Sequence, residues 1–316
     1  MRKIIVRGRK EHLDKIRAEI ERKPEFLSYF YEDRVEIYVA DRDTGEIIKR
    51  LQESLDMRYR DSLIEVSKPE FVVSIKSKRD FEEKMPVEKL VDITKPYSKI
   101  DFGLVILTGV ASIVALTGLL LNNSVIIIGA MLLAPLLGPI HCFAINLSVG
   151  HVKFAFGGIV NLIANLLFAV LLSGIVSMTI HLFYPIELTE EIILRTYLNP
   201  VYIIMAISLG FASILSLSKG IAESIAGVAV AASLLPPAVA AGVLLWHSFP
   251  LGIKAVMLTM ENVAGLMVGS IFSIYVLGIR PNRYYERKVA RIYTYRMLSM
   301  LTLLLILLAT ATYLLH

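Results

Sequence analysis

The chain is almost without cysteine. Its 316 residues include one, Cys142, which lies in an apolar run. A single cysteine excludes a disulfide framework and any zinc site built from several cysteines of one chain. Common enzyme motifs are also missing: the six histidines show no HExxH spacing, and there is no glycine-rich phosphate loop and no GxSxG sequence. We therefore expect a protein that is not an enzyme.

Charge is scarce after residue 100. Of the 61 Asp, Glu, Lys and Arg side chains, 44 lie in residues 1–100, which leaves 17 for the other 216 positions. The first 100 residues hold 23 basic and 21 acidic side chains, so they do not form the basic domain that is typical of nucleic-acid binding. Hydrophobic residues make up 55% of the chain. The sequence predicts a charged soluble domain followed by a membrane domain, without a nucleic-acid partner.

Residues 1–68 alternate short β-branched runs with helical periodicity. Strands are expected at 3–7, 26–31, 34–40 and 63–66, and helices at 10–22 and about 44–57. The order β-α-β-β-α-β predicts a ferredoxin-like α+β domain, for which a structural role and ligand sensing stay equally open. Residues 69–100 are expected to form a linker with one strand, at 70–76, and one helix, at 86–98.

Seven apolar segments follow the linker. They cover about 102–121, 124–147, 154–182, 200–218, 224–246, 254–278 and 297–315. Most reach the ~20 residues that a helix needs to cross a bilayer. We expect a transmembrane core at 101–279, then a basic interfacial helix and a final transmembrane helix within 280–316. Residues 282–296 mix basic side chains with four tyrosines, which favours contact with anionic lipids.

Adding 101 to a position in the first three segments often gives the same residue in the next three. The matches include Gly109 with Gly210, Pro135 with Pro236, Lys153 with Lys254, and Asn161 with Asn262. We interpret 102–182 and 200–279 as repeats of three spans each. An odd number of spans gives the two copies opposite orientations, as in many secondary transporters.

The positive charges predict the orientation in the cell membrane. Basic residues follow the sixth segment, and the charged domain precedes the first, so both are expected in the cytoplasm. The loop 184–200 and the C-terminus are then expected outside.

Prolines mark the second and fifth spans as candidates for a substrate site. Pro135, Gly138 and Pro139 lie in the second, and Pro236 and Pro237 in the fifth. Each proline removes a helix hydrogen bond, so we expect both helices to kink or break near the middle of the membrane. Transmembrane helices that are interrupted at corresponding positions of two repeats point to a substrate site. The alternative is that the prolines only kink these helices and no ligand binds there.

Polar residues in the third and sixth spans complete the candidate site. They are Asn161, Asn165, Glu261 and Asn262. For transport, the asparagines would bind a polar solute and Glu261 would carry a coupling proton or cation. Alternatively, the asparagines cap carbonyl groups at the proline breaks and Glu261 extends to the outer interface. We favour the substrate site for the asparagines and the interface for Glu261.

Lys153 and Lys254 begin the third and sixth spans. We expect them to anchor the helix ends in the headgroups. Attraction of anions to the two mouths of a pathway is the alternative.

Two strings resemble a known family. They are Gly129-Ala-Met-Leu-Leu-Ala-Pro135-Leu-Leu-Gly138-Pro139 and the later Ala-Ser-Leu-Leu-Pro236-Pro237, which occur together with the small charged N-terminal domain. In this combination the chain, over about residues 1–280, resembles the prokaryotic membrane family called domain of unknown function 389. The resemblance implies a polytopic membrane protein with no established substrate or cofactor.

These patterns lead to two hypotheses. The first is a transporter or channel-like protein for a small polar or charged solute, regulated or assembled through the cytoplasmic domain and expected to form a homo-oligomer. The second is a membrane sensor or scaffold that does not transport and whose soluble domain binds a metabolite or partner. A hydrated cavity between the two breaks would favour the first, and fully packed breaks the second.

Overall fold

The computed structural model describes residues 2–21, 27–39, 44–55, 62–67, 87–220, 223–281 and 284–314. The chain divides into two compact units, Met1–Pro86 and Val87–His316. The strand predicted at 70–76 lies outside the described residues.

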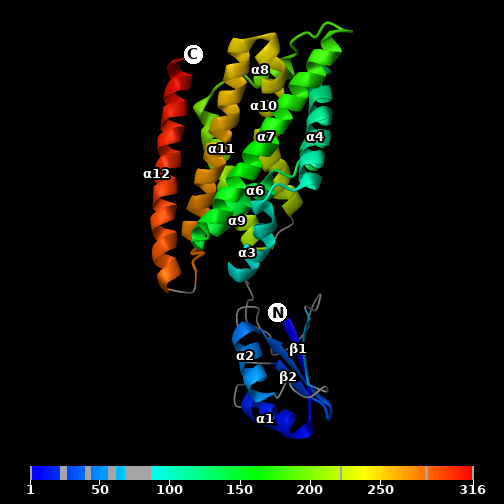
Figure 1. The fold of residues 1–316 in the computed structure, drawn as a ribbon, viewed down its shortest axis with the longest axis vertical. Coiled ribbons are helices and arrows are strands. Elements are labelled where there is room, and N and C mark those ends of the chain that lie inside the picture. Colours follow the sequence, from blue (N-terminus) through cyan, green and yellow to red (C-terminus); the bar gives the residue numbers. More distant parts are fainter. Residues whose placement is uncertain are drawn as a thin grey trace. The chain divides into compact units, whose positions relative to one another are not determined.

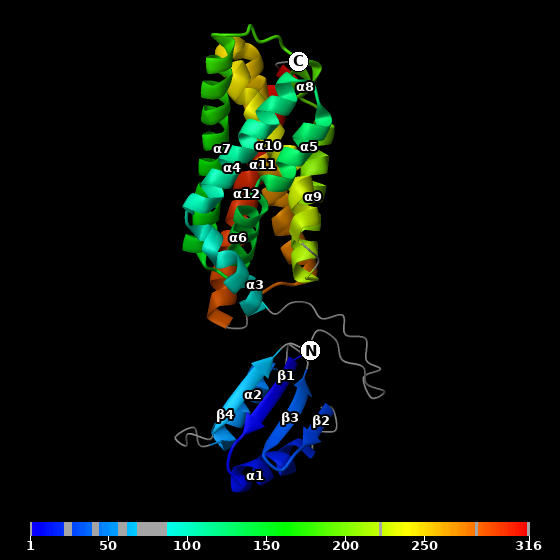
Figure 2. The same ribbon diagram turned by 90° about the vertical axis from the view of Figure 1, so that its right-hand side faces the viewer.

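The N-terminal unit contains four strands and two helices. They are β1 (Arg2–Arg7), α1 (Lys10–Glu21), β2 (Leu27–Phe30), β3 (Arg34–Val39), α2 (Thr44–Ser54) and β4 (Leu63–Ser67). Neighbouring strands are antiparallel in the order β2-β3-β1-β4, as Figure 2 shows. This sheet order, with a helix after β1 and another after β3, is the predicted ferredoxin-like arrangement.

Alternation along the strands separates the two faces of this sheet. The face that packs against α1 and α2 is apolar and includes Ile4, Val6, Val35, Ile37 and Val39, with Leu13, Ile16, Leu51 and Leu55 from the helices. Burial of these side chains is the main favourable contribution to the stability of the unit.

Glu36 lies on the opposite face, between two core residues of β3. Its carboxylate oxygens are 2.9 Å from Lys3 Nζ and 3.0 Å from Arg34 Nε. Burial alone would raise the pKa of Glu36, but the hydrogen bonds and charges of Lys3 and Arg34 outweigh it and lower that pKa. The hydrogen bond to Glu36 is likewise the main reason why the pKa of Lys3 is raised.

The second unit is helical. Its elements are α3 (Val87–Thr94), the 3-10 helix η1 (Lys95–Ser98), α4 (Phe102–Leu120), α5 (Ser124–Leu133), α6 (Leu137–Ser148), α7 (Val152–His181), α8 (Glu190–Leu194), α9 (Pro200–Ser218), α10 (Glu223–His247), α11 (Phe249–Leu277) and α12 (Tyr284–Leu314). Among the described residues, six of these helices are long and apolar enough to cross a membrane: α4, α7, α9, α10, α11 and α12. The bent pair α5 and α6 brings the number to as many as seven. These helices coincide with the seven predicted apolar segments. We refer to residues 87–316 as the membrane unit.

The centre of the membrane unit is formed by α10 and α11. In the apolar stretch of each helix, 78% of the residues of α10 and 72% of those of α11 are buried, but only 11% of those of α12. Accordingly, α12 runs along the edge of the unit beside α11 (Figure 1). Added Cβ atoms on Gly265 and Gly269 would overlap Ala206 and Ile207 of α9, so this GxxxG pair allows close contact between α9 and α11.

Two predicted interruptions differ from the structure. A kink or break was expected at Pro236 and Pro237, and α10 continues through both as one unbroken helix. A separate interfacial helix was expected at 282–296, but α12 is one helix from Tyr284 onwards, and residues 282–283 are not described. The sequence from 284 to 314 contains neither proline nor glycine, so no residue in it favours a break.

The break at Pro135 is confirmed. α5 ends at Leu133 and α6 begins at Leu137, with a bend of 47° between them. Ala134 has extended backbone angles, φ −77° and ψ 116°. Steric contact with the proline ring favours this conformation in the residue that precedes it.

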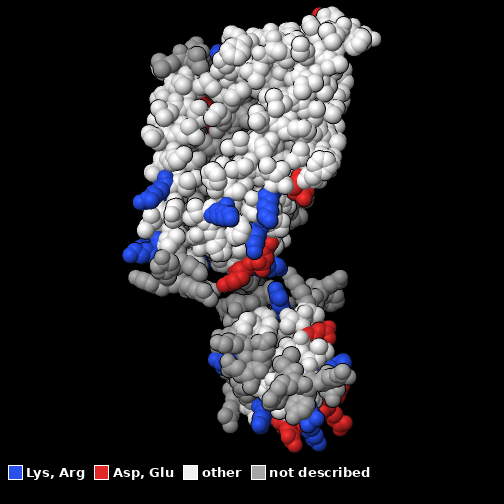
Figure 3. All heavy atoms as spheres, viewed as in Figure 1, with Lys and Arg blue, Asp and Glu red and all other residues white. Residues whose placement is uncertain are grey.

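Charged side chains collect at one end of the membrane unit. Figure 3 shows Lys and Arg at the end that carries α3 and the start of α12, below a flank that is almost free of charge. The sequence of α3, of η1 with its C-cap residue, and of the start of α12 supplies the cations Lys89, Lys95, Lys99, Arg287, Lys288 and Arg291. An uncharged flank with a basic end is the pattern expected of a protein embedded in a bilayer.

Candidate functional site around helix α11

Asn262 completes the hydrogen bonding of helix α10. Its Nδ2 donates to the carbonyl oxygen of Ser233 at 2.7 Å. In an unbroken helix this carbonyl would accept from the backbone N–H of residue 237, but Pro237 has no N–H. Asn262 therefore replaces the donor that Pro237 lacks, which favours continuation of α10 through that proline. The capping alternative is confirmed for Asn262, although the helix that it caps is not broken.

Asn161 has different partners. Its Nδ2 donates to the carbonyl oxygens of Tyr97 at 2.9 Å and Lys99 at 3.0 Å, at the end of η1. Its Oδ1 accepts from Asn165 Nδ2 at 2.7 Å, and Asn165 Oδ1 accepts from the Thr108 hydroxyl at 3.0 Å. The chain of bonds holds η1, α4 and α7 together. At the sequence offset of 101, Thr108 and Asn165 correspond to leucines, so the second repeat has no such network.

The proline break in the second span is packed against neighbouring elements. Pro135 lies between α5 and α6, and Gly138 and Pro139 lie in the first turn of α6. A Cβ on Gly138 would overlap the ring of Tyr97, and one on Gly158 of α7 would lie 2.7 Å from the carbonyl oxygen of Pro139. Tyr97 and α7 therefore cover this part of the break.

Glu261 is fully buried, at 0% exposure. Its Oε1 accepts a hydrogen bond from the Thr312 hydroxyl of α12, whereas Oε2 has no hydrogen-bond partner among the described residues. The interpretation that Glu261 extends to the outer interface is therefore wrong, because α12 lies over that face of α11. A carboxyl group in an apolar interior is costly unless it is paired, bonded or protonated.

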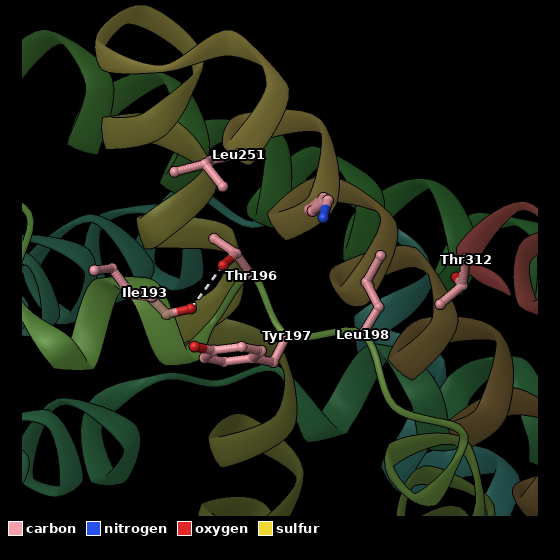
Figure 4. A pocket seen from close by; sticks show the side chains of 7 residues that line it. Ile193, Thr196, Tyr197, Leu198, Leu251 and Thr312 are labelled. Carbon is pink, nitrogen blue, oxygen red and sulfur yellow. Dashed lines mark hydrogen bonds between the residues drawn. The ribbon is translucent and has the colours of Figure 1, made fainter. Parts of the chain in front are cut away.

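A cavity of about 220 Å³ lies next to this contact, between the loop that follows α8, the first turns of α11 and the end of α12. Figure 4 shows its lining, which consists of Ile193, Thr196, Tyr197, Leu198, Leu251, Lys254 and Thr312. Lys254 is the only charged residue in that lining, and it makes no ion pair with any residue that the structure describes. Thr312 both lines the cavity and donates to Glu261.

Lys254 and Glu261 are also related along α11. Seven residues separate them, which corresponds to about two helical turns and ~10 Å of rise on the same face of a helix. The cavity and the buried carboxylate are thus linked through Thr312. This site was only partly predicted: Glu261 was a candidate, Lys254 was expected to be a headgroup anchor, and Thr312 and Tyr197 were missed.

Thr312 was missed because the last span lies outside the sequence repeat. A hydroxyl residue in an apolar helix was the available signal, but threonines also occur elsewhere in that helix. No group of three or more His, Cys, Asp or Glu that could hold a metal ion occurs in the described part of the chain.

Comparisons with known proteins agree with the resemblance noted in the sequence. Residues 131–268 match the sequence model of a family described as domain of unknown function (DUF389). The DUF389 match runs from α5 into α11, so it includes the Pro135 break, Asn161, Lys254, Glu261 and Asn262, and it excludes the N-terminal unit and α12.

One relative covers more of the chain. An uncharacterized protein of Methanocaldococcus jannaschii is 28% identical over 273 residues, which are 85% of this chain and 84% of the relative. No solved structure matches the chain.

Proposed function

We propose that this protein is a transporter or channel-like protein for a small polar or charged solute, and that Glu261 carries a coupling proton or cation. The observation that supports the proposal best is the carboxylate itself, which is fully buried in an apolar helix with one oxygen unpartnered among the described residues. Ionisable residues in such positions are typical of ion and proton pathways.

The asparagines have different roles in this proposal. Asn262 adjoins Glu261 in the sequence, and its Oδ1 has no partner among the described residues, so it can still accept a hydrogen bond. Asn161 uses its amide group for the two linker carbonyls. We therefore assign solute contact to Asn262, with Asn161, Asn165 and the Pro135 break positioning the helices around it.

The inverted repeat is part of the same proposal. Helix contacts support it: α4 packs against α5 and α7, and α9 packs against α10 and α11. The matched glycines follow this pattern, because Gly109 faces Phe168 of α7 and Gly210 faces Leu266 of α11. Two such halves could rock against each other and expose the site to each side of the membrane in turn.

The partners proposed from the sequence remain proposals. Arg287, Lys288 and Arg291 are in the first turns of α12, where they could contact anionic lipid headgroups. The outer face of α12 exposes apolar residues such as Leu303, Ile306 and Leu307, which lipid or a second copy of the chain could cover.

The second candidate function is a membrane sensor or scaffold. The covered break at Pro135 favours it, as does the linkage of η1, which follows the soluble unit in the sequence, to the Asn161 network. In this case the N-terminal unit would bind a metabolite or partner, and α4 and α7 would receive the signal without any solute crossing.

Flux in liposomes separates the two functions. The purified protein would be reconstituted and tested with small anions, amino acids and cations under an imposed pH gradient. We expect gradient-driven uptake of one solute class, a loss of about tenfold or more with Glu261→Gln, and no loss with the exposed control Glu187→Gln. Uptake that Glu261→Gln leaves unchanged would show that Glu261 is not the coupling group, and absence of flux for every class would favour the sensor.

A further inference from the structure

We propose that the cavity beside Lys254 binds a small organic anion, namely a carboxylate with a short apolar or aromatic tail. The inference deepens the proposed function by naming the class of solute, and it rests on that function only for the claim that the bound anion is then transported.

Charge is the first argument. Lys254 is half-buried and is the only charged residue in the cavity lining, with no ion pair to any described residue. Removing an ammonium group from water without a counter-ion costs free energy, so an anion in the cavity would be stabilised. Glu261 does not serve as this counter-ion, because it lies about two turns, or ~10 Å, further along α11.

The size and the walls of the cavity give the second argument. Its volume of about 220 Å³ exceeds the cavity of ~150 Å³ that accommodates benzene in an engineered protein core. Ile193, Leu198 and Leu251 supply apolar side chains on its walls, so a carbon tail would replace water against them. A bare inorganic anion would leave these walls without contact.

The Tyr197 hydroxyl group is a possible hydrogen-bond donor to the carboxylate group of the ligand. The ring of Tyr197 lies along the cavity in Figure 4, and its hydroxyl has no hydrogen-bond partner among the described residues. This hydroxyl is therefore free to donate to a ligand in the cavity, at a residue that is 55% exposed. The other two hydroxyls already donate, Thr196 to the carbonyl of Ile193 at 2.7 Å and Thr312 to Glu261.

Position links the cavity to the proposed coupling group. Thr312 lines the cavity, and its hydroxyl group lies within hydrogen-bond distance of both Glu261 Oε1 and the carbonyl oxygen of Leu308. An anion at Lys254 and a proton at Glu261 would thus occupy neighbouring places on one face of α11, which suits a carboxylate that moves together with a proton.

Titration calorimetry on the full chain in non-ionic detergent tests the binding. The probes are benzoate, its neutral analogue benzamide, and acetate, which keeps the head but lacks the tail. We expect benzoate to bind, and benzamide and acetate to bind about tenfold or more weakly. Lys254→Gln should weaken benzoate binding about tenfold or more, whereas Lys254→Arg should retain most of it. Lys153→Gln removes the corresponding lysine of the other repeat and should change nothing.

Several outcomes would overturn the inference: no benzoate binding, equal binding of benzamide, or equal binding to the Lys254→Gln variant. Displacement of benzoate by added phosphatidylglycerol would assign the cavity to a lipid headgroup and would also overturn it. If Lys254→Gln fails to fold, Leu251→Trp gives a second test, because it fills the cavity while retaining the charge and should abolish benzoate binding.

The result is separable from that of the flux experiment. Benzoate binding through Lys254 without flux would retain this site and reject transport. Flux of another solute without benzoate binding would retain transport and reject this site.

Discussion

At the scale of single residues, Asn262 and Pro237 act as a pair: one supplies the hydrogen-bond donor that the other lacks. Asn262→Ala leaves the buried carbonyl of Ser233 without a donor, and we expect it to lower the free energy of unfolding by about 1–3 kcal/mol. In a Pro237→Ala background the new backbone N–H can bond to this carbonyl, so the cost of Asn262→Ala should fall by more than half.

A double-mutant cycle measured by thermal unfolding in detergent checks this coupling. Gly129→Ala is a suitable reference variant, because an added methyl group there meets no atom within 4 Å. Equal costs of Asn262→Ala in the two backgrounds would mean that Asn262 stabilises the fold by some other contact.

Glu36 gives a second prediction at this scale, in the N-terminal unit. Its pKa is lowered in the folded state, so its ion pairs stabilise the fold at neutral pH and this contribution is lost as the pH falls through the folded-state pKa. Glu36→Gln should reduce stability by about 1 kcal/mol at pH 7, with a difference that shrinks as the pH falls below the ordinary value of 4.5.

Hydrogen exchange of β1 and β3 amides in the full chain, followed against pH, measures this difference. Glu65→Gln is the control, because Glu65 is an exposed glutamate of β4. A difference between the wild type and Glu36→Gln that persists unchanged to acidic pH would contradict the role given to the ion pairs.

At the scale of elements, composition and periodicity predicted most of what is observed. All seven apolar segments are helical, and the strand order of the N-terminal unit follows from the β-α-β-β-α-β pattern. The two proline sites could not be distinguished locally. Pro135 follows an extended residue and breaks the second span, whereas Pro237 is tolerated because Asn262, 29 residues from Ser233, supplies a donor. Such tertiary compensation leaves no mark in the local sequence.

Contact between α9 and α11 allows a prediction about elements. The Cβ of Gly269→Ala would overlap the backbone of Ile207, and backbone atoms cannot move aside as the end of a side chain can. We expect this variant to lose about 2 kcal/mol or more of stability, or to fail to accumulate in the membrane. The comparison is Gly129→Ala, which adds the same methyl group to an apolar helix where no atom lies within 4 Å.

Thermal unfolding of both variants in the same detergent gives the measurement. If Gly269→Ala is as stable as Gly129→Ala, the close approach of α9 and α11 is not required for the fold.

At the scale of the whole molecule, the candidate site combines predictable and unpredictable parts. Glu261 and Asn262 were recognisable because polar groups are rare in apolar helices. Thr312 and Tyr197 are contributed by α12 and by the loop after α8, and only folding brings them to α11. Lys254 was assigned to the headgroups because position along a helix predicts depth, but it does not predict which neighbours surround a side chain.

The orientation of the two halves is the remaining question at this scale, and cysteine labelling answers it. The single natural cysteine, Cys142, is buried. It can be replaced, for example by Cys142→Ala, so that only the introduced cysteines react with the label. If the repeat is inverted, Glu190→Cys lies outside and Lys89→Cys lies in the cytoplasm. An impermeant maleimide added to intact cells should then label the first variant fully and the second only after permeabilisation.

The orientation of the two repeats decides whether alternating access is possible. An inverted pair of halves can expose one site alternately to the two sides, whereas two halves of the same orientation have no such symmetry. Labelling of both positions from the same side would leave an even number of spans between them, so the bent pair α5 and α6 would enter and leave on one face. The repeat would then no longer support alternating access, although Glu261 and the Lys254 cavity could still form a pore.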